Sequence, residues 1–117
     1  MKAHKVPYLE NLGWYQSWEV NKPIDKDNNP EFWFNYPFIS FLEKKLTKNL
    51  EIFEYGSGHS TLKFARKCKN ITSVDNNPNW HNYLKDIQPK NATLILQEDL
   101  DLYPEEITKF DKKYDII

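Results

Sequence analysis

Two short apolar runs separated by a helical pattern dominate the middle of the chain. The first run covers residues 50–53 and stops at a glycine pair, Gly56 and Gly58. Apolar residues then recur at helical spacing over 60–68, and a second apolar run follows at 71–74. This order of patterns predicts a strand, a tight turn, a helix and a second strand.

An amphipathic helix is predicted before the first strand. Pro37 suits a first helical position, and the pattern continues through Lys48. Apolar residues fall at i, i+3, i+4 and i+8, and they are Phe38, Phe41, Leu42 and Leu46. We expect this face to pack beside the first strand.

The second half of the chain predicts further alternation of helices and strands. Asn77 is a good N-cap for a helix that begins at Pro78. A third strand is expected over 92–96, a short helix over 104–112, and the start of a fourth strand at Tyr114. Strands that alternate with helices predict an α/β fold with a mostly parallel sheet and helices on both faces.

The N-terminal stretch, residues 1–36, has a different character. Aromatic residues are frequent around a turn-rich segment, 21–30, that we do not expect to form regular structure. They are Tyr8, Trp14, Tyr15, Trp18, Phe32, Trp33, Phe34 and Tyr36. These side chains are expected to cover one face of the sheet, or to form a lid or a pocket wall that sorts substrates by shape. The two roles are compatible.

The glycine turn and an acid after it have the layout of a nucleotide-binding βαβ unit. Asp75 ends the second apolar run, 19 positions after Gly56 (75 minus 56). A carboxylate there can accept both hydroxyls of a ribose, and glycines let the backbone approach a ligand closely. The dinucleotide fingerprint expects a small residue at position 61, where this chain has Thr61, and Glu54 would repel a pyrophosphate.

The pattern Glu-x-Gly-x-Gly-x-Ser over residues 54–60 resembles motif I of class I S-adenosylmethionine-dependent methyltransferases, an acid followed by Gly-x-Gly-x-Gly. The resemblance implies that the acid lies near the amino group of the cofactor and that the turn holds its methionine part. The residues concerned are Glu54, Gly56, Ser57, Gly58 and Ser60. Ser60 replaces the third glycine. An ammonium group favours a nearby carboxylate, which agrees with this assignment.

The resemblance also implies contacts to the adenosine part of the cofactor. Asp75 would hold the ribose, and Asn76 would lie against the adenine. Asp99 would bind the adenine amino group, with Leu100 packed on the ring. An alternative for Asp99 is a helix-capping or turn role, because residues 99–101 are themselves turn-like.

For the fold, the resemblance implies a Rossmann-like sheet of order 3-2-1-4, with the cofactor over the carboxyl ends of strands 1 and 2. Residues 37–117 would form this cofactor-binding domain in part, truncated after the start of strand 4, and residues 1–36 an arm or lid. The segments 32–43 and 53–61 look like a bacterial methyltransferase-like subfamily whose acceptor we cannot name. Self-association or a completing chain is expected at the open edge of strand 4, and methyl transfer by the 117-residue chain alone is not expected.

Composition restricts the partners. The net charge is −1, with 16 basic and 17 acidic residues, which argues against binding nucleic acid through bulk charge. We interpret Arg66, Lys67 and Lys69 as a solvated helix face. No apolar run approaches the length of a membrane span and residues 1–12 lack the core of a signal peptide, so a cytoplasmic location is expected. Cys68 should be an inert core thiol.

The catalytic group and the acceptor stay open. Transfer of a methyl group from a sulfonium can depend largely on positioning, so a dedicated base is not required. His59 is a candidate acid or base, or else a loop residue that contacts cofactor through its backbone, and His81 is expected at the surface or edge. No metal site is expected. Two other classes remain: a NAD(P)-dependent oxidoreductase-type domain, disfavoured by Thr61 and Glu54, and a non-catalytic fragment or subunit completed by another chain.

Overall fold

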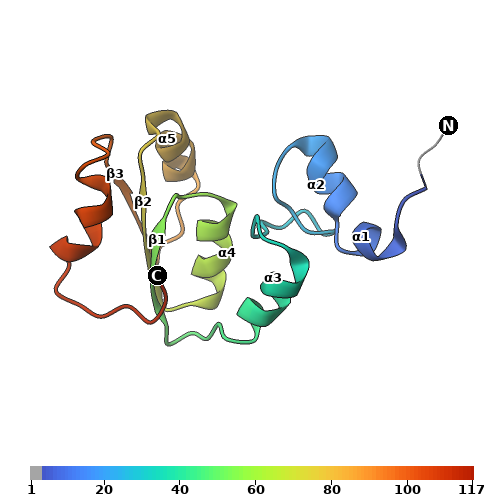
Figure 1. The fold of residues 1–117 in the computed structure, drawn as a ribbon, viewed down its shortest axis with the longest axis horizontal. Helices are drawn as coiled ribbons and strands as arrows, with labels where there is room; N and C mark the ends of the chain where they lie inside the picture. The colour runs from blue at the N-terminus through green and yellow to red at the C-terminus, as the bar shows by residue number, and fades with distance from the viewer. Residues whose placement is uncertain (1–3) are drawn as a thin grey trace.

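The computed structural model describes residues 4–117, and a parallel sheet lies at the centre of this part of the chain (Figure 1). Its strands are β1 (Glu51–Tyr55), β2 (Asn70–Asp75) and β3 (Ala92–Leu96). They pair in the order β1-β2-β3, with β2 in the middle. The predicted α/β class and parallel sheet are therefore confirmed.

Helices connect the strands and cover the sheet. α4 (His59–Lys67) joins β1 to β2, α5 (Pro78–Asp86) joins β2 to β3, and a 3-10 helix, η1 (Tyr103–Lys109), follows β3. α4 and η1 lie on opposite faces of the sheet (Figure 1). As predicted, Asn77 caps α5, since its side chain accepts a hydrogen bond from the Trp80 backbone N–H at 3.1 Å.

Each strand contributes to two cores because successive side chains point to opposite faces. Ile52 pairs in register with Ile71, which pairs with Ala92, and all three belong to the buried cluster beneath α4. Phe53 faces the other way and packs edge-on against Phe110 after η1, with ring centroids 6.2 Å apart. The α4 cluster also contains the predicted core thiol, Cys68, 2% exposed, and burial raises its pKa.

Helix α3 (Tyr36–Glu43) is shorter than predicted and turns a different face inward. Its buried residues are Ile39 and Leu42, whereas Phe38 and Phe41 are 43% and 56% exposed. The expectation that Phe38 and Phe41 pack beside the first strand is wrong. Ile39 and Leu42 instead join the α4 cluster, together with Phe32 from the preceding segment.

The N-terminal arm contains two helices that the sequence pattern did not reveal, α1 (Pro7–Asn11) and α2 (Trp14–Val20). The turn-rich segment behind them is closed by an antiparallel bridge between Ile24 and Pro30. The molecule is elongated, 54 × 30 × 24 Å, with the arm at one end (Figure 1). Of the eight aromatic residues named above, all in the described part, Phe32 alone is buried, so these side chains do not together cover a sheet face.

The predicted fourth strand is reduced to one parallel bridge, between Ile116 and Ile52. The Phe53 N–H donates to the Ile116 carbonyl at 3.0 Å, and the Asp115 N–H donates to the Glu51 carbonyl at 2.8 Å. Tyr114, where the strand was expected to begin, is not in strand conformation. Within residues 4–117, no helix is both long enough and apolar enough to cross a bilayer.

Candidate functional site

The loops that follow the three strands share one edge of the sheet, because the strands are parallel. The glycine turn, 56–58, follows β1, Asp75 ends β2, and Asp99 lies shortly after β3. The edge therefore brings the loops of the predicted site residues to the same side of the molecule. The individual side chains have different surroundings there.

The two glycines of the turn differ in what they require. Gly56 has φ +87°, the left-handed region that disfavours a side chain, and a Cβ built on it would meet nothing within 4 Å. Gly58 has φ −178°, extended backbone that any residue adopts. A Cβ on Gly58 would lie 3.8 Å from Trp80 Nε1, an ordinary contact. The backbone of the turn thus requires a glycine at position 56, and of the two positions Gly56 is the one that borders open space.

Asp75 is buried and ties the glycine turn to the start of α5. Its Oδ2 accepts the Ser57 backbone N–H at 2.8 Å, and its Oδ1 accepts the Asn77 backbone N–H at 2.8 Å. A carboxylate has about four acceptor positions, so further hydrogen bonds are open to it. Asp75 therefore has a structural function whether or not it binds a ribose.

Glu54 lies within a group of three hydroxyls beneath the turn. Its carboxylate accepts from the hydroxyls of Ser60, of Thr61 at 2.5 Å and of Ser73 at 2.7 Å. Thr61 Oγ1 also accepts the Gly58 N–H at 2.9 Å. Burial raises the pKa of Glu54; the three hydroxyls oppose this change, and the charge of Asp75 adds to it.

The sequence analysis did not predict that three hydroxyl side chains would surround Glu54. Ser73 is the register partner of Glu54 in the neighbouring strand, so the two side chains share a sheet face. An acid opposite a serine in adjacent parallel strands was the available signal. Thr61, which we discussed only as a departure from the dinucleotide fingerprint, is fully buried and is part of this group.

A pocket of about 310 Å³ lies between the glycine turn and the arm. Its lining residues come from the arm, the turn, the start of α4 and α5, and they are Asn21, Lys22, Pro23, Trp33, Ser57, Gly58, His59, Ser60 and Trp80. Trp80 donates its indole N–H to the Ser57 carbonyl. Ser57 is 7% exposed, and its hydroxyl has no hydrogen-bond partner among the described residues.

Three of the predicted cofactor residues line this pocket, namely Ser57, Gly58 and Ser60. The other six do not, and they are Glu54, Gly56, Asp75, Asn76, Asp99 and Leu100. Asn76 and Leu100 are exposed at the same edge of the sheet. Asp99 is also exposed, and its Oδ1 accepts the Asp101 N–H at 2.9 Å, the contact expected of a turn aspartate.

Two histidines near the turn are buried. The ring Nδ1 of His59 lies 2.8 Å from the Pro23 carbonyl, and because a carbonyl oxygen can only accept, Nδ1 is the donor. His81 is 8% exposed, and its Nδ1 has no partner within residues 4–117. The prediction of a surface or edge position for His81 is wrong, because His81 and Leu84 form the inward face of α5.

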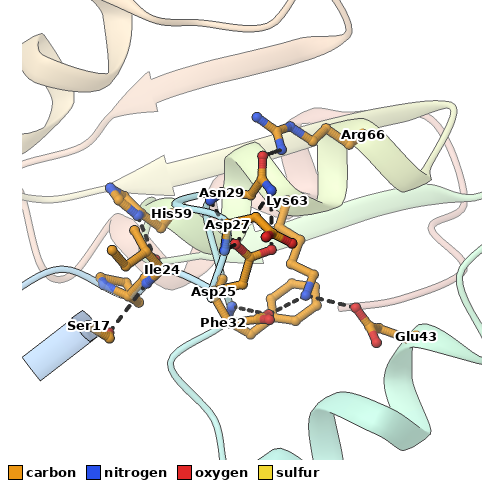
Figure 2. Close-up of polar contacts among 12 residues, drawn as sticks. Ser17, Ile24, Asp25, Asp27, Asn29, Phe32, Glu43, His59, Lys63 and Arg66 are labelled. Atoms are coloured by element: carbon orange, nitrogen blue, oxygen red, sulfur yellow. Dashed lines mark hydrogen bonds and ion pairs between the residues drawn. The ribbon is translucent and has the colours of Figure 1, made fainter. Parts of the chain in front are cut away.

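The arm is fixed to the sheet domain by polar contacts along α4 (Figure 2). Lys63 forms ion pairs with Glu31 of the arm and, at 2.8 Å, with Glu43 of α3. Arg66 donates to the Asn29 side chain at 3.0 Å. Arg66 and its neighbours Lys67 and Lys69 are exposed, as predicted, yet Arg66 also helps to hold the arm.

Tyr103 is a further residue at this edge that the sequence did not indicate. Its hydroxyl donates to the Val74 carbonyl at 3.2 Å. Burial raises the pKa of Tyr103, and the neighbouring charge of Asp75 adds to the effect. Within the described residues, no three His, Cys, Asp or Glu side chains are grouped so that they could hold a metal ion.

No protein-family model matches this chain, and no curated protein matches it at a significant level. The assignment of a function therefore depends on the geometry of the glycine turn and its surroundings.

Proposed function

We propose that this chain is the cofactor-binding part of an S-adenosylmethionine-dependent methyltransferase with a Rossmann-like fold. The observation that carries the proposal is the pair of acids on either side of the open glycine turn. Glu54 lies at the end of β1 and Asp75 at the end of β2, and Asp75 binds the turn directly through the Ser57 N–H.

The charge of this edge favours a cationic ligand group over a pyrophosphate. Two carboxylates flank the turn, and burial already disfavours the charged form of Glu54. A further negative group at the turn, such as a pyrophosphate, would be repelled by these two carboxylates. An ammonium or sulfonium group would be attracted by them, and S-adenosylmethionine carries both.

The residues present fit this cofactor in two respects. A side chain on Gly56 would project into open space, which is the space that a ligand held by the turn would use. The Ser57 hydroxyl is buried without a partner among the described residues, and such a group is normally satisfied by water or a ligand. When bound, the cofactor would supply an electrophilic methyl group.

The chain's own residues would position the acceptor. The pocket between the turn and the arm lies beside the proposed cofactor site and has Trp33 and Trp80 in its walls. His59 also lines it, and the Pro23 carbonyl fixes the orientation of its ring. In this proposal His59 is the candidate to accept a proton from the acceptor.

The test is a calorimetric titration of the whole chain with S-adenosylhomocysteine, S-adenosylmethionine and NAD. We expect saturable binding of the first two and none of NAD. Tighter binding of NAD would overturn the proposal and favour the oxidoreductase-type alternative. Absence of binding by all three would favour the non-catalytic alternative.

A matched pair of leucines tests the orientation of the ligand. Leu100 and Leu102 are 66% and 45% exposed in the same loop, so replacing either by alanine should preserve the fold. If Leu100 packs on the adenine, Leu100→Ala should weaken S-adenosylhomocysteine binding about 3- to 10-fold, in line with the loss of part of a buried leucine contact. Leu102→Ala should not. Equal effects would remove Leu100 from the site.

A further inference from the structure

A second pocket, of about 270 Å³, lies within the arm between α2 and the segment 31–36. Six aromatic side chains from these two stretches contribute to its wall, and they are Trp14, Trp18, Phe32, Trp33, Phe34 and Tyr36. Glu31 also lines it and is the acid in this wall. We refer to this feature as the arm pocket.

The rings of the arm pocket are exposed to a degree that their role in the fold does not explain. Trp18 and Trp33 are 72% and 74% exposed, and Phe34 is 47% exposed. The buried anchor of this segment is Phe32, which is 2% exposed and belongs to the α4 cluster. Several exposed aromatic rings around one hollow indicate a binding surface more than a packing surface.

The charge beneath the arm pocket is negative. Lys63 is paired with both Glu31 and Glu43, so this group has two carboxylates for one ammonium and a net charge of −1. The Lys63 side chain is 10% exposed and lies over the Phe32 ring, 4.9 Å from its centroid (Figure 2). Lys63 does not line the arm pocket, whereas Glu31 does.

We propose that the arm pocket binds a methylated ammonium group. Aromatic faces attract cations through the ring quadrupole, and a methylated ammonium loses little hydration when several rings surround it. The net charge of −1 on the group formed by Glu31, Lys63 and Glu43 adds long-range attraction and disfavours anions. At about 270 Å³ the pocket is slightly smaller than the roughly 300 Å³ at which sites for drug-sized ligands begin, so a small head group is the suitable occupant.

This inference is independent of the proposed cofactor. The two pockets share the wall formed by Asn21, Pro23 and Trp33, but the arm pocket contains none of the glycine-turn residues. If the cofactor titration shows no binding, the proposal for the arm pocket is unaffected. If no ammonium compound binds the arm pocket, the cofactor proposal is unaffected.

The test compares choline with 3,3-dimethylbutan-1-ol, its uncharged isostere, in NMR titrations of the whole chain at constant ionic strength. The indole N–H signals of Trp14 and Trp18 report on the arm pocket alone, that of Trp80 reports on the pocket at the glycine turn, and that of Trp33 reports on the wall that the two pockets share. We expect choline to shift the arm signals saturably and to bind at least about 2-fold more tightly than the isostere, the lower end of a cation–aromatic contribution. Equal affinities, or no saturable shift with choline, would overturn the proposal.

Variants locate the binding site. Trp18→Ala should weaken choline binding about 2- to 30-fold and, because Trp18 is 72% exposed, should preserve the fold. Phe41→Ala, which removes a 56% exposed ring outside the arm pocket, should change nothing. If circular dichroism shows that Trp18→Ala alters the fold, Trp14→Ala provides the same test, because Trp14 is 41% exposed and lines the arm pocket but not the pocket at the glycine turn. Equal affinities of a folded tryptophan variant and the unmodified chain would overturn the proposal.

Discussion

In residues 37–117, which form the sheet and its helices and are called the sheet half below, large apolar side chains are buried: Phe53 is 1% exposed and Phe64 is 6% exposed. In the arm, Trp18 and Trp33 are 72% and 74% exposed, although they are at least as hydrophobic. The difference comes from the backbone. Strands and the helices between them present their side chains in regular rows that can be buried together, whereas the arm has two short helices and a turn-rich link.

The two regions are consequently stabilised in different ways. The sheet half has a continuous core, and the arm depends on a few contacts to it, chiefly Phe32, Lys63 and Asn29. The arm should therefore detach without unfolding the sheet when those contacts are removed. The following substitutions test this difference, beginning with the largest expected effect.

Phe32→Ala should cost about 3–5 kcal/mol in the free energy of unfolding, the usual range for removing a buried phenylalanine. Phe32 is 2% exposed, so the variant leaves a cavity beneath α4 and releases the arm. Phe34→Ala, at a ring that is 47% exposed, should cost about 0.5 kcal/mol. Urea denaturation measures both, and similar losses would mean that the arm has no single anchor.

Lys63→Met should cost about 1–3 kcal/mol, because two carboxylates lose their shared partner at a poorly exposed position. Limited proteolysis should show cleavage in the segment 21–30 well before the sheet half is cut. Lys67→Met, at an exposed position on the same helix, serves as the control. Uniform protection of both regions in Lys63→Met would contradict a separately docked arm.

Gly56→Ala should cost about 1–2 kcal/mol, because φ +87° is unfavourable for a residue with a Cβ even where space is open. Gly58→Ala should cost almost nothing, since its backbone is extended and the added Cβ makes an ordinary contact with Trp80. Thermal denaturation separates the two. A larger cost at Gly58 would show that the turn adopts another conformation in solution.

The smallest expected effect is a pH dependence that arises from Glu54. Burial raises the pKa of this carboxyl in the folded state, so the folded protein holds the proton more tightly than the unfolded chain. Stability should therefore fall as the pH rises from the ordinary glutamate value of 4.5 to the higher folded value, and the full loss should be present above it. Unfolding free energies of wild type and Glu54→Gln should diverge across that window. Glu105→Gln, an exposed acid in η1, is the control.

Periodicity was sufficient to predict the strands and helices of the sheet half because these elements are long enough for their patterns of apolar residues to repeat. The third strand was predicted at the residues where β3 lies, and Asn77 and Pro78 begin α5 as expected. For α3 the same reasoning chose Phe38 and Phe41 over Ile39 as inward residues. Helical spacing alone does not distinguish two overlapping apolar faces. Packing with Phe32, which lies outside this helix, decides which face turns inward.

The site was predicted less completely, for a related reason. Glycines and acids at the ends of strands can be recognised from their order in the chain. The pocket beside the turn depends on Asn21, Lys22 and Pro23, whose position follows from how the arm docks. α1 and α2 were missed because each has fewer than eight residues and lies outside the alternation of strands and helices that indicated the equally short η1.

The double hydrogen bond of Asp75 has a consequence for how this position can change in evolution. Its two oxygens accept the backbone N–H groups of Ser57 and Asn77, and an amide in its place would offer one acceptor atom where two are used. A descendant of this chain that no longer bound any ligand would still be under selection to keep an aspartate at this position. An acid at the end of β2 is thus weak evidence of nucleotide binding by itself, and drift at Asn76 and Leu100, which lack such contacts, would be the more informative record of a lost function.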